Sequence, residues 1–98
     1  MGELEEWKRI PELPDYEVSS RGRVKSFKYS YPRILSWRYS GTSPVIQLST
    51  YEGRKCFKIA ELVLLAFVGP HFIGYDIGYK SNRRQTVDLT NLYWRLRD

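Results

Sequence analysis

The sequence is poor in the residues on which most catalytic and metal sites depend. Its 98 residues include one histidine, His71, and one cysteine, Cys56, so neither a His/Cys metal cluster nor an internal disulfide can form within the chain. No glycine-rich phosphate loop is present. The longest apolar run, residues 60–70, contains Glu61 and falls short of the ~18–20 residues that cross a bilayer. These absences exclude a helical membrane protein and most enzyme classes that short motifs define.

The N-terminus also lacks the features of a secretion signal. It opens with the acidic sequence MGELEE, where a signal peptide has a basic segment followed by an apolar one. Together with the single cysteine, this predicts a cytoplasmic location. No membrane partner is expected.

Acidic residues are scarce in the middle of the chain, and this scarcity is the first functional indication. Residues 1–20 have a net charge of −4, residues 21–58 of +8 and residues 59–98 of +1, within a total of +5. The middle block holds nine bases and one acid, and its strands also contain several aromatic residues. Cations and flat rings together are typical of a nucleic-acid surface. The alternative is a solvated basic face whose aromatic residues belong to the core.

The same middle region has the pattern of short β-strands. Between residues 16 and 58, β-branched and aromatic runs alternate with Gly, Ser and Pro at intervals of about ten residues, which predicts an antiparallel meander. Cys56, in the last of these runs, is expected to fill space in the core rather than to act as a nucleophile. We expect strands at residues 16–19, 22–29, 33–39, 44–50 and 54–58.

After residue 58 the hydrophobic period becomes helical, which predicts one buried helix that ends at Gly69–Pro70. A loop with a short strand is expected over residues 72–80, a polar turn over 81–85 and an extended or turn-like segment over 87–94. The predicted fold class is therefore α+β, a small antiparallel β meander followed by one buried helix. The helical stripe consists of Ile59, Leu62, Val63, Ala66 and Phe67.

Two groups of residues resemble parts of the HNH homing endonucleases of phages and mobile introns. The segments EWKRIP (6–11) and YEVSSRGRVKS (16–26) are similar to the N-terminal DNA-binding module of that family. The segment DLTNLYW (88–94) is similar to the Asn-Leu-x-Trp signature of its nuclease core. The resemblance implies one domain over residues 1–98, with a basic β module at 5–55 and an HNH-like core remnant at 56–98 that lacks its last helix.

The resemblance also implies a ββα-metal site, in which a histidine activates water and neighbouring side chains hold a divalent ion. Counted back from Asn91, the histidine position falls on Tyr79 and the ligand position beside it on Gly78. Tyrosine is a poor base at neutral pH and glycine has no side-chain ligand. The resemblance therefore implies a degenerate site with no catalytic residue and no cofactor. Asn91 and Trp94 are expected to be structural.

These observations lead to one main hypothesis. We expect a double-stranded DNA-binding protein of phage or mobile-element type, in a bacterial or phage-infected cell, that derives from an HNH homing endonuclease and does not cleave. Arg83 and Arg84 lie where the nuclease would meet the scissile strand and could hold phosphate. The remaining predicted DNA-binding residues come from the basic block: Arg21, Arg23, Lys25, Lys28, Arg33, Arg38, Lys55 and Lys58.

Two alternatives stay open. The first is a protein-directed effector that binds a host nucleic-acid enzyme through the acidic N-terminus or the basic face. The second is a nicking endonuclease that requires Mg²⁺ or Mn²⁺ and is completed by a second copy or by His71, with Asp76 as a ligand. Without such a rescue, His71 is expected to be an ordinary loop residue.

Overall fold

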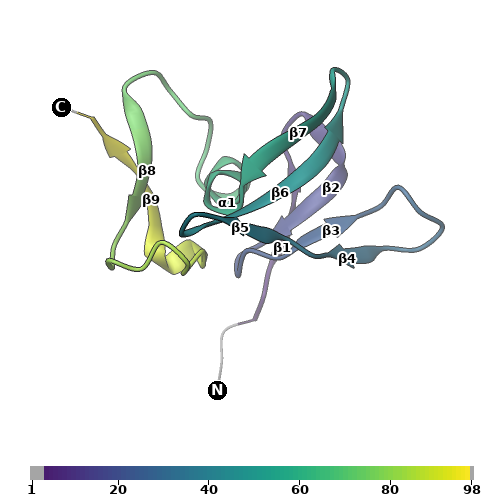
Figure 1. Cartoon of the computed structure of the whole chain (residues 1–98), viewed down its shortest axis with the longest axis horizontal. Coiled ribbons are helices and arrows are strands. Elements are labelled where there is room, and N and C mark those ends of the chain that lie inside the picture. Colours follow the sequence, from purple (N-terminus) through teal and green to yellow (C-terminus); the bar gives the residue numbers. More distant parts are fainter. Residues whose placement is uncertain (1–3, 98) are drawn as a thin grey trace.

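A computed structural model describes residues 4–97, which form three antiparallel sheets around one α-helix, α1 (Figure 1). Sheet A has the strand order β1-β2-β3-β4, sheet B the order β5-β6-β7, and sheet C consists of β8 and β9. The predicted α+β class is confirmed. The elements are β1 (Trp7–Ile10), β2 (Leu13–Ser19), β3 (Val24–Ser26), β4 (Arg33–Leu35), β5 (Arg38–Ser40), β6 (Ser43–Thr50), β7 (Gly53–Lys58), α1 (Ile59–Phe67), β8 (Tyr75–Tyr79), the 3-10 turn η1 (Leu89–Asn91) and β9 (Leu92–Leu96).

The helix α1 is the centre of the core, as its apolar pattern predicts. It contacts strands of all three sheets, and Ile59, Leu62 and Val63 are fully buried. The helix ends where the backbone N–H groups of Val68 and Gly69 both donate to the carbonyl oxygen of Leu64. Gly69 then adopts a φ of 147°, which favours glycine. Within residues 4–97, no helix is long and apolar enough to cross a membrane.

The N-terminal and C-terminal parts of the chain share this core. Gly22, in the turn between β2 and β3, has a φ of 86°, and a Cβ there would lie 2.5 Å from Cγ2 of Val87 and 3.2 Å from Cγ2 of Ile59. The backbone N–H of Leu89 donates to the carbonyl oxygen of Ser20 at 2.8 Å. The turn therefore needs glycine for its conformation and for its space, and it fixes sheet A against the segment that leads into sheet C.

The antiparallel meander is present, but its strands differ from the predicted ones in three respects. The run 33–39 is split between β4 and β5, which belong to different sheets, and the run 22–29 is a strand only at β3. The strand β1 was not expected, because Pro11 directly follows its four residues and obscures the pattern. Cys56 is exposed rather than in the core. In each case alternation gives the local period but cannot tell which sheet a strand joins or which of its faces is covered.

Candidate nucleic-acid interface

Sheet B turns one face to the core and the other to solvent. In β6, Ile46 and Leu48 are buried against the core, whereas Gln47 between them is exposed. Residues that face each other across antiparallel strands point to the same side of the sheet. The register pairs Gln47 with Cys56, Ser49 with Arg54, and Val45 with both Lys58 and Arg38. The outer face of sheet B therefore consists of Arg38, Val45, Gln47, Ser49, Arg54, Cys56 and Lys58, of which Val45 is only 4% exposed and Ser49 is half-buried.

The three cations of this face are available to a ligand. Arg38, Arg54 and Lys58 are exposed, and within residues 4–97 none of them has an ion-pair partner. Arg54 lies in the basic block of residues 21–58 but is not one of the binding residues predicted from the sequence. Unpaired cations on one face of a sheet attract a polyanion, and these three are not held by neighbouring acids.

A groove of about 670 Å³ lies between this face and sheet A, and Gln47 is one of its lining residues. Lys28, Tyr29 and Trp37 line it together with Arg38 and Arg54. The β3–β4 hairpin, which carries Lys28 and Tyr29, projects from the molecule (Figure 1). The groove extends the positive surface from sheet B onto the hairpin.

The predicted aromatic contacts divide into two kinds. Tyr29, Tyr31 and Tyr39 are 53%, 64% and 55% exposed, whereas Trp37 is partly buried against the core. Arg33 begins β4 of sheet A rather than a strand of sheet B, and its guanidinium carbon lies 4.6 Å from the centre of the Tyr29 ring in the β3–β4 hairpin. The three tyrosines can reach a ligand and Trp37 cannot do so fully.

The outer face of sheet A, which includes Trp7, Arg9, Glu17, Lys25 and Ile34 with Arg23 just before β3, is also basic, but its charges are held within the protein. The Lys25 ammonium lies 4.0 Å and the Arg23 guanidinium 5.5 Å from the centre of the Trp7 ring. Nε of Arg23 also donates to a Glu5 carboxylate oxygen at 2.9 Å. Arg23 and Lys25 thus have partners that phosphate would have to displace.

The ion pair between Glu5 and Arg23 shifts the pKa values of both groups. The hydrogen bonds from Arg23 lower the pKa of Glu5 from 4.5 to about 2, against the opposing effect of burial. The same bonds raise the pKa of Arg23 above its ordinary value. Arg21 contributes electrostatically at Glu5 as well. These three residues form a contact between the N-terminal segment and the β2–β3 turn.

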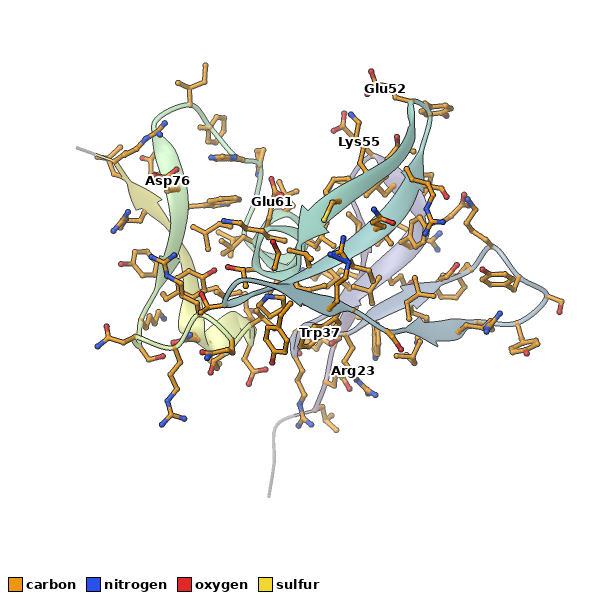
Figure 2. All side chains as sticks on the ribbon, viewed as in Figure 1. Arg23, Trp37, Glu52, Lys55, Glu61 and Asp76 are labelled. Atoms are coloured by element: carbon orange, nitrogen blue, oxygen red, sulfur yellow. The ribbon has the colours of Figure 1, made fainter. Side chains whose placement is uncertain are left out.

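Lys55 lies on the opposite face of sheet B from the other cations. It is paired in register with the buried Leu48, and its ammonium binds the carboxylate of Glu52. The hydrogen bond from Lys55 lowers the pKa of Glu52. Figure 2 shows Lys55 and Glu52 together near the β6–β7 turn, at the opposite side of the molecule from Arg23. The ten predicted binding residues therefore do not form one surface.

A second opening, of about 720 Å³, lies between β7 and β8 beside α1. Glu61 of α1 and Asp76 of β8 both line it, and Figure 2 shows Asp76 on β8 and Glu61 at the helix. Lys58 lines it too, which joins this cleft to the outer face of sheet B. Arg84 and Arg95 add positive charge, whereas Arg83 is exposed in the neighbouring loop.

The residues of this cleft do not fit the divalent ion that the sequence resemblance implies. A Cβ at Gly78 would lie 2.6 Å from Cζ of Tyr93, so the ring of Tyr93 fills the space that a ligand side chain at position 78 needs. Burial raises the pKa of Tyr79, so still less of its phenol is ionised and able to accept a proton at neutral pH. Among the described residues, no three His, Cys, Asp or Glu side chains lie close enough to hold a metal.

His71 is held by contacts within the protein. Its ring stacks on that of Trp94, with centres 4.5 Å apart and planes 6° apart, and its Nε2 contacts the carbonyl oxygen of Tyr75. Trp94 in turn donates from Nε1 to the carbonyl oxygen of Gly69 at 3.0 Å. His71 and Asp76 do line the same cleft, but the stack and the hydrogen bond give His71 a structural position.

Asn91 organises the loop between β8 and β9. Its side-chain oxygen accepts a hydrogen bond from the backbone N–H of Ser81 at 2.9 Å. Its amide nitrogen donates to the carbonyl oxygens of Thr86 at 2.9 Å and Arg83 at 3.4 Å. Asn91 is 8% exposed, so these bonds satisfy a buried amide and fix the loop that carries Arg83 and Arg84.

Two comparisons with known proteins bear on the family and the fold of the chain. Residues 5–55 match the NUMOD4 motif. A solved structure described as "DNA binding and cleavage by the HNH homing endonuclease I-HmuI" superposes on the chain with a TM-score of 0.81 and 27% sequence identity. The chain belongs to the HNH homing endonuclease family. The superposition covers 93% of this chain and 52% of I-HmuI, so the chain spans about half the length of that endonuclease. No curated protein matches the sequence.

The resemblance to homing endonucleases indicated which segments carry the site, but it did not indicate which side chains lie on its exposed surface. Arg54, Gln47 and Arg95 were not predicted, although Gln47 and Arg54 stand at alternate positions to apolar residues in their strands. That alternation was the available signal. It could not be used without knowing which face of sheet B the helix covers.

Proposed function

We propose that this chain binds double-stranded DNA through the outer face of sheet B and does not cleave it. The observation that carries the proposal is the set of three exposed cations, Arg38, Arg54 and Lys58, which lack ion-pair partners within residues 4–97. They lie in the part of the chain that has the fold of a DNA-binding and DNA-cleaving endonuclease. Host proteins are not needed to explain this surface.

The spacing of the cations suits a groove of the duplex. Val45 and Ser49 of β6 mark the two ends of the face, and four strand residues span about 13 Å. Lys58 and Arg38 flank Val45 at one end, and Arg54 flanks Ser49 at the other. The major groove of B-DNA is about 12 Å wide, so cations at both ends can reach phosphates on its two sides.

Neighbouring elements extend the contact along the duplex. Lys28 lines the groove on the side of sheet A, and Arg84 lines the cleft on the side of sheet C. Both side chains are exposed. Each also lies near a ring, Lys28 at 5.9 Å from the centre of Tyr16 and Arg84 at 6.0 Å from the centre of Tyr79, and both distances are longer than the 4.0 Å between Lys25 and Trp7. With the three cations of sheet B they bring the candidate phosphate contacts to five.

Lack of cleavage follows from the chemistry of the cleft. Hydrolysis of the HNH type needs a base and a metal ion, and Tyr79 and Gly78 supply neither at the aligned positions. The Tyr93 ring also blocks a ligand at position 78. The cleft keeps cations that can hold a phosphate, but it lacks groups that could activate water.

A salt titration of duplex binding tests the first half of the proposal. With five phosphate contacts, log K should fall with log salt concentration at a slope of about −4.5. Fluorescence anisotropy of a labelled duplex of random sequence measures this slope. Absence of duplex binding at low ionic strength would overturn the proposed function.

Incubation with supercoiled plasmid tests the second half. We expect no nicked circles with Mg²⁺ or with Mn²⁺, at protein concentrations that saturate binding. Any nicking by the wild-type chain would contradict the proposal, and nicking that persists in a His71→Ala variant would show that His71 is not responsible. Nicking that is lost in His71→Ala would instead favour the rescue by His71 and Asp76.

A further inference from the structure

We propose that Gln47 reads a base edge in the major groove and gives the chain a preference for adenine at one position. This inference rests on the proposed duplex binding. It concerns the sequence that is bound rather than the affinity for phosphate.

The position of Gln47 is central on the outer face of sheet B. It lies two residues from Val45 and two residues from Ser49 along β6, so the flanking cations at both ends are each about 7 Å away along the strand. When those cations hold phosphates on both sides of the groove, the centre of the face lies over the base pairs. Gln47 is the only exposed residue of β6.

The side chain of Gln47 is not used by the protein itself. Within residues 4–97, its amide forms no hydrogen bond to another group, whereas the buried amide of Asn91 forms three. Its partner across the strands is Cys56, whose side chain is small and only weakly polar. An exposed and unpartnered amide at the centre of a cationic face has no evident structural purpose.

The chemistry of the amide selects the base. The side-chain oxygen can accept from N6–H of adenine while the side-chain NH₂ donates to N7, which is the paired contact that glutamine makes in the major groove. Ser49 is shorter and half-buried, so it reaches less far. The strand that presents both residues is fixed, because the backbone N–H of Ser49 donates to Oη of Tyr16 at 3.1 Å.

Selection of bound duplexes from a randomised pool tests this inference. The wild-type chain should enrich one position in adenine. In Gln47→Ala the enrichment of adenine at that position should fall by about tenfold or more. Gln47→Glu should shift the same position towards cytosine, because a carboxylate accepts from N4–H of cytosine. Gln85→Ala is the matched control, since Gln85 is an exposed glutamine in the loop before β9 and should leave the selected sequence unchanged.

The outcomes separate this inference from the proposed function. Salt-dependent binding with the same selected sequence in wild type and Gln47→Ala overturns the role of Gln47 and leaves duplex binding intact. If the wild-type chain binds duplexes but selects no sequence, the role of Gln47 is likewise overturned and duplex binding stands. Failure of wild type to bind any duplex overturns both. Circular dichroism of each variant identifies a change in fold, and Gln47→Glu provides a second readout if Gln47→Ala does not fold.

Discussion

The outer faces of sheets A and B carry similar cations in different surroundings. On sheet A, Arg23 is bound by Glu5 and lies over the ring of Trp7. On sheet B, Arg38 and Arg54 are exposed and have no ion-pair partner within the described residues. Both sets come from the same basic block of the sequence, so the charge of a segment does not locate its binding surface. What distinguishes the two faces is whether an acid or a ring already occupies each cation.

This difference has a simple energetic basis. Phosphate binding by Arg23 requires loss of a charge-assisted hydrogen bond to Glu5, so the gain from the new contact is offset by the loss of the old one. Arg54 loses only its hydration. The cations of sheet A therefore contribute to folding, and those of sheet B remain for a ligand.

The largest expected effect is on DNA affinity when the cations of sheet B are removed. The triple variant Arg38→Ala, Arg54→Ala, Lys58→Ala should weaken duplex binding a hundredfold or more at about 0.1 M salt and reduce the salt slope by about three. Anisotropy titrations at several salt concentrations measure both quantities. A slope unchanged from wild type would place the DNA on another surface and end the distinction between the two faces.

A smaller effect, on stability, is expected in sheet C, where the ring of Tyr93 packs over Gly78. Gly78→Ala should lower the free energy of unfolding by about 1 kcal/mol, because the new Cβ forces the ring of Tyr93 off the strand. Urea denaturation measures this change. In a Tyr93→Ala background the same substitution should cost almost nothing, and an equal cost in both backgrounds would show that the ring does not fill this space.

Arg23→Ala should have the reverse profile of a sheet B variant. It removes the partner of Glu5 and the cation over Trp7, so the urea midpoint should fall. The salt slope of DNA binding should change by less than one. The matched control is Arg54→Ala, for which we expect an unchanged midpoint and a slope reduced by about one. If Arg23→Ala reduces the slope as much as Arg54→Ala does, the cations of both faces bind DNA.

The smallest effect is a pH dependence that originates at Glu5. Its pKa is about 2 in the folded chain and 4.5 ordinarily, so the ionised carboxylate stabilises the fold at any pH above about 4.5. This stabilisation is lost as the pH falls from 4.5 towards 2. The free energy of unfolding should therefore decline less steeply over this window in Glu5→Gln than in wild type. Glu6→Gln, at an exposed neighbouring position, should decline as wild type does.

Much of the fold could be predicted from local patterns. The apolar stripe from Ile59 to Phe67 predicts α1 because helical spacing and burial act within one segment. The division of residues 33–39 between two sheets could not be predicted, because strand pairing depends on residues distant in sequence. The aligned positions Tyr79 and Gly78 indicated a missing metal site from sequence, but the ring of Tyr93 over Gly78 is visible only in the structure.

The sequence by itself determined the basic block, the helix and the family, because each depends on composition, on short-range spacing or on local motifs. Only the tertiary structure decided which cations remain available. Lys55 and Arg54 are adjacent in the chain, yet they point to opposite faces of β7 because side chains alternate along a strand. Packing of α1 against one face of sheet B leaves Arg54 and Gln47 on the other, and Glu5 reaches Arg23 only because strand pairing brings residues 18 positions apart together.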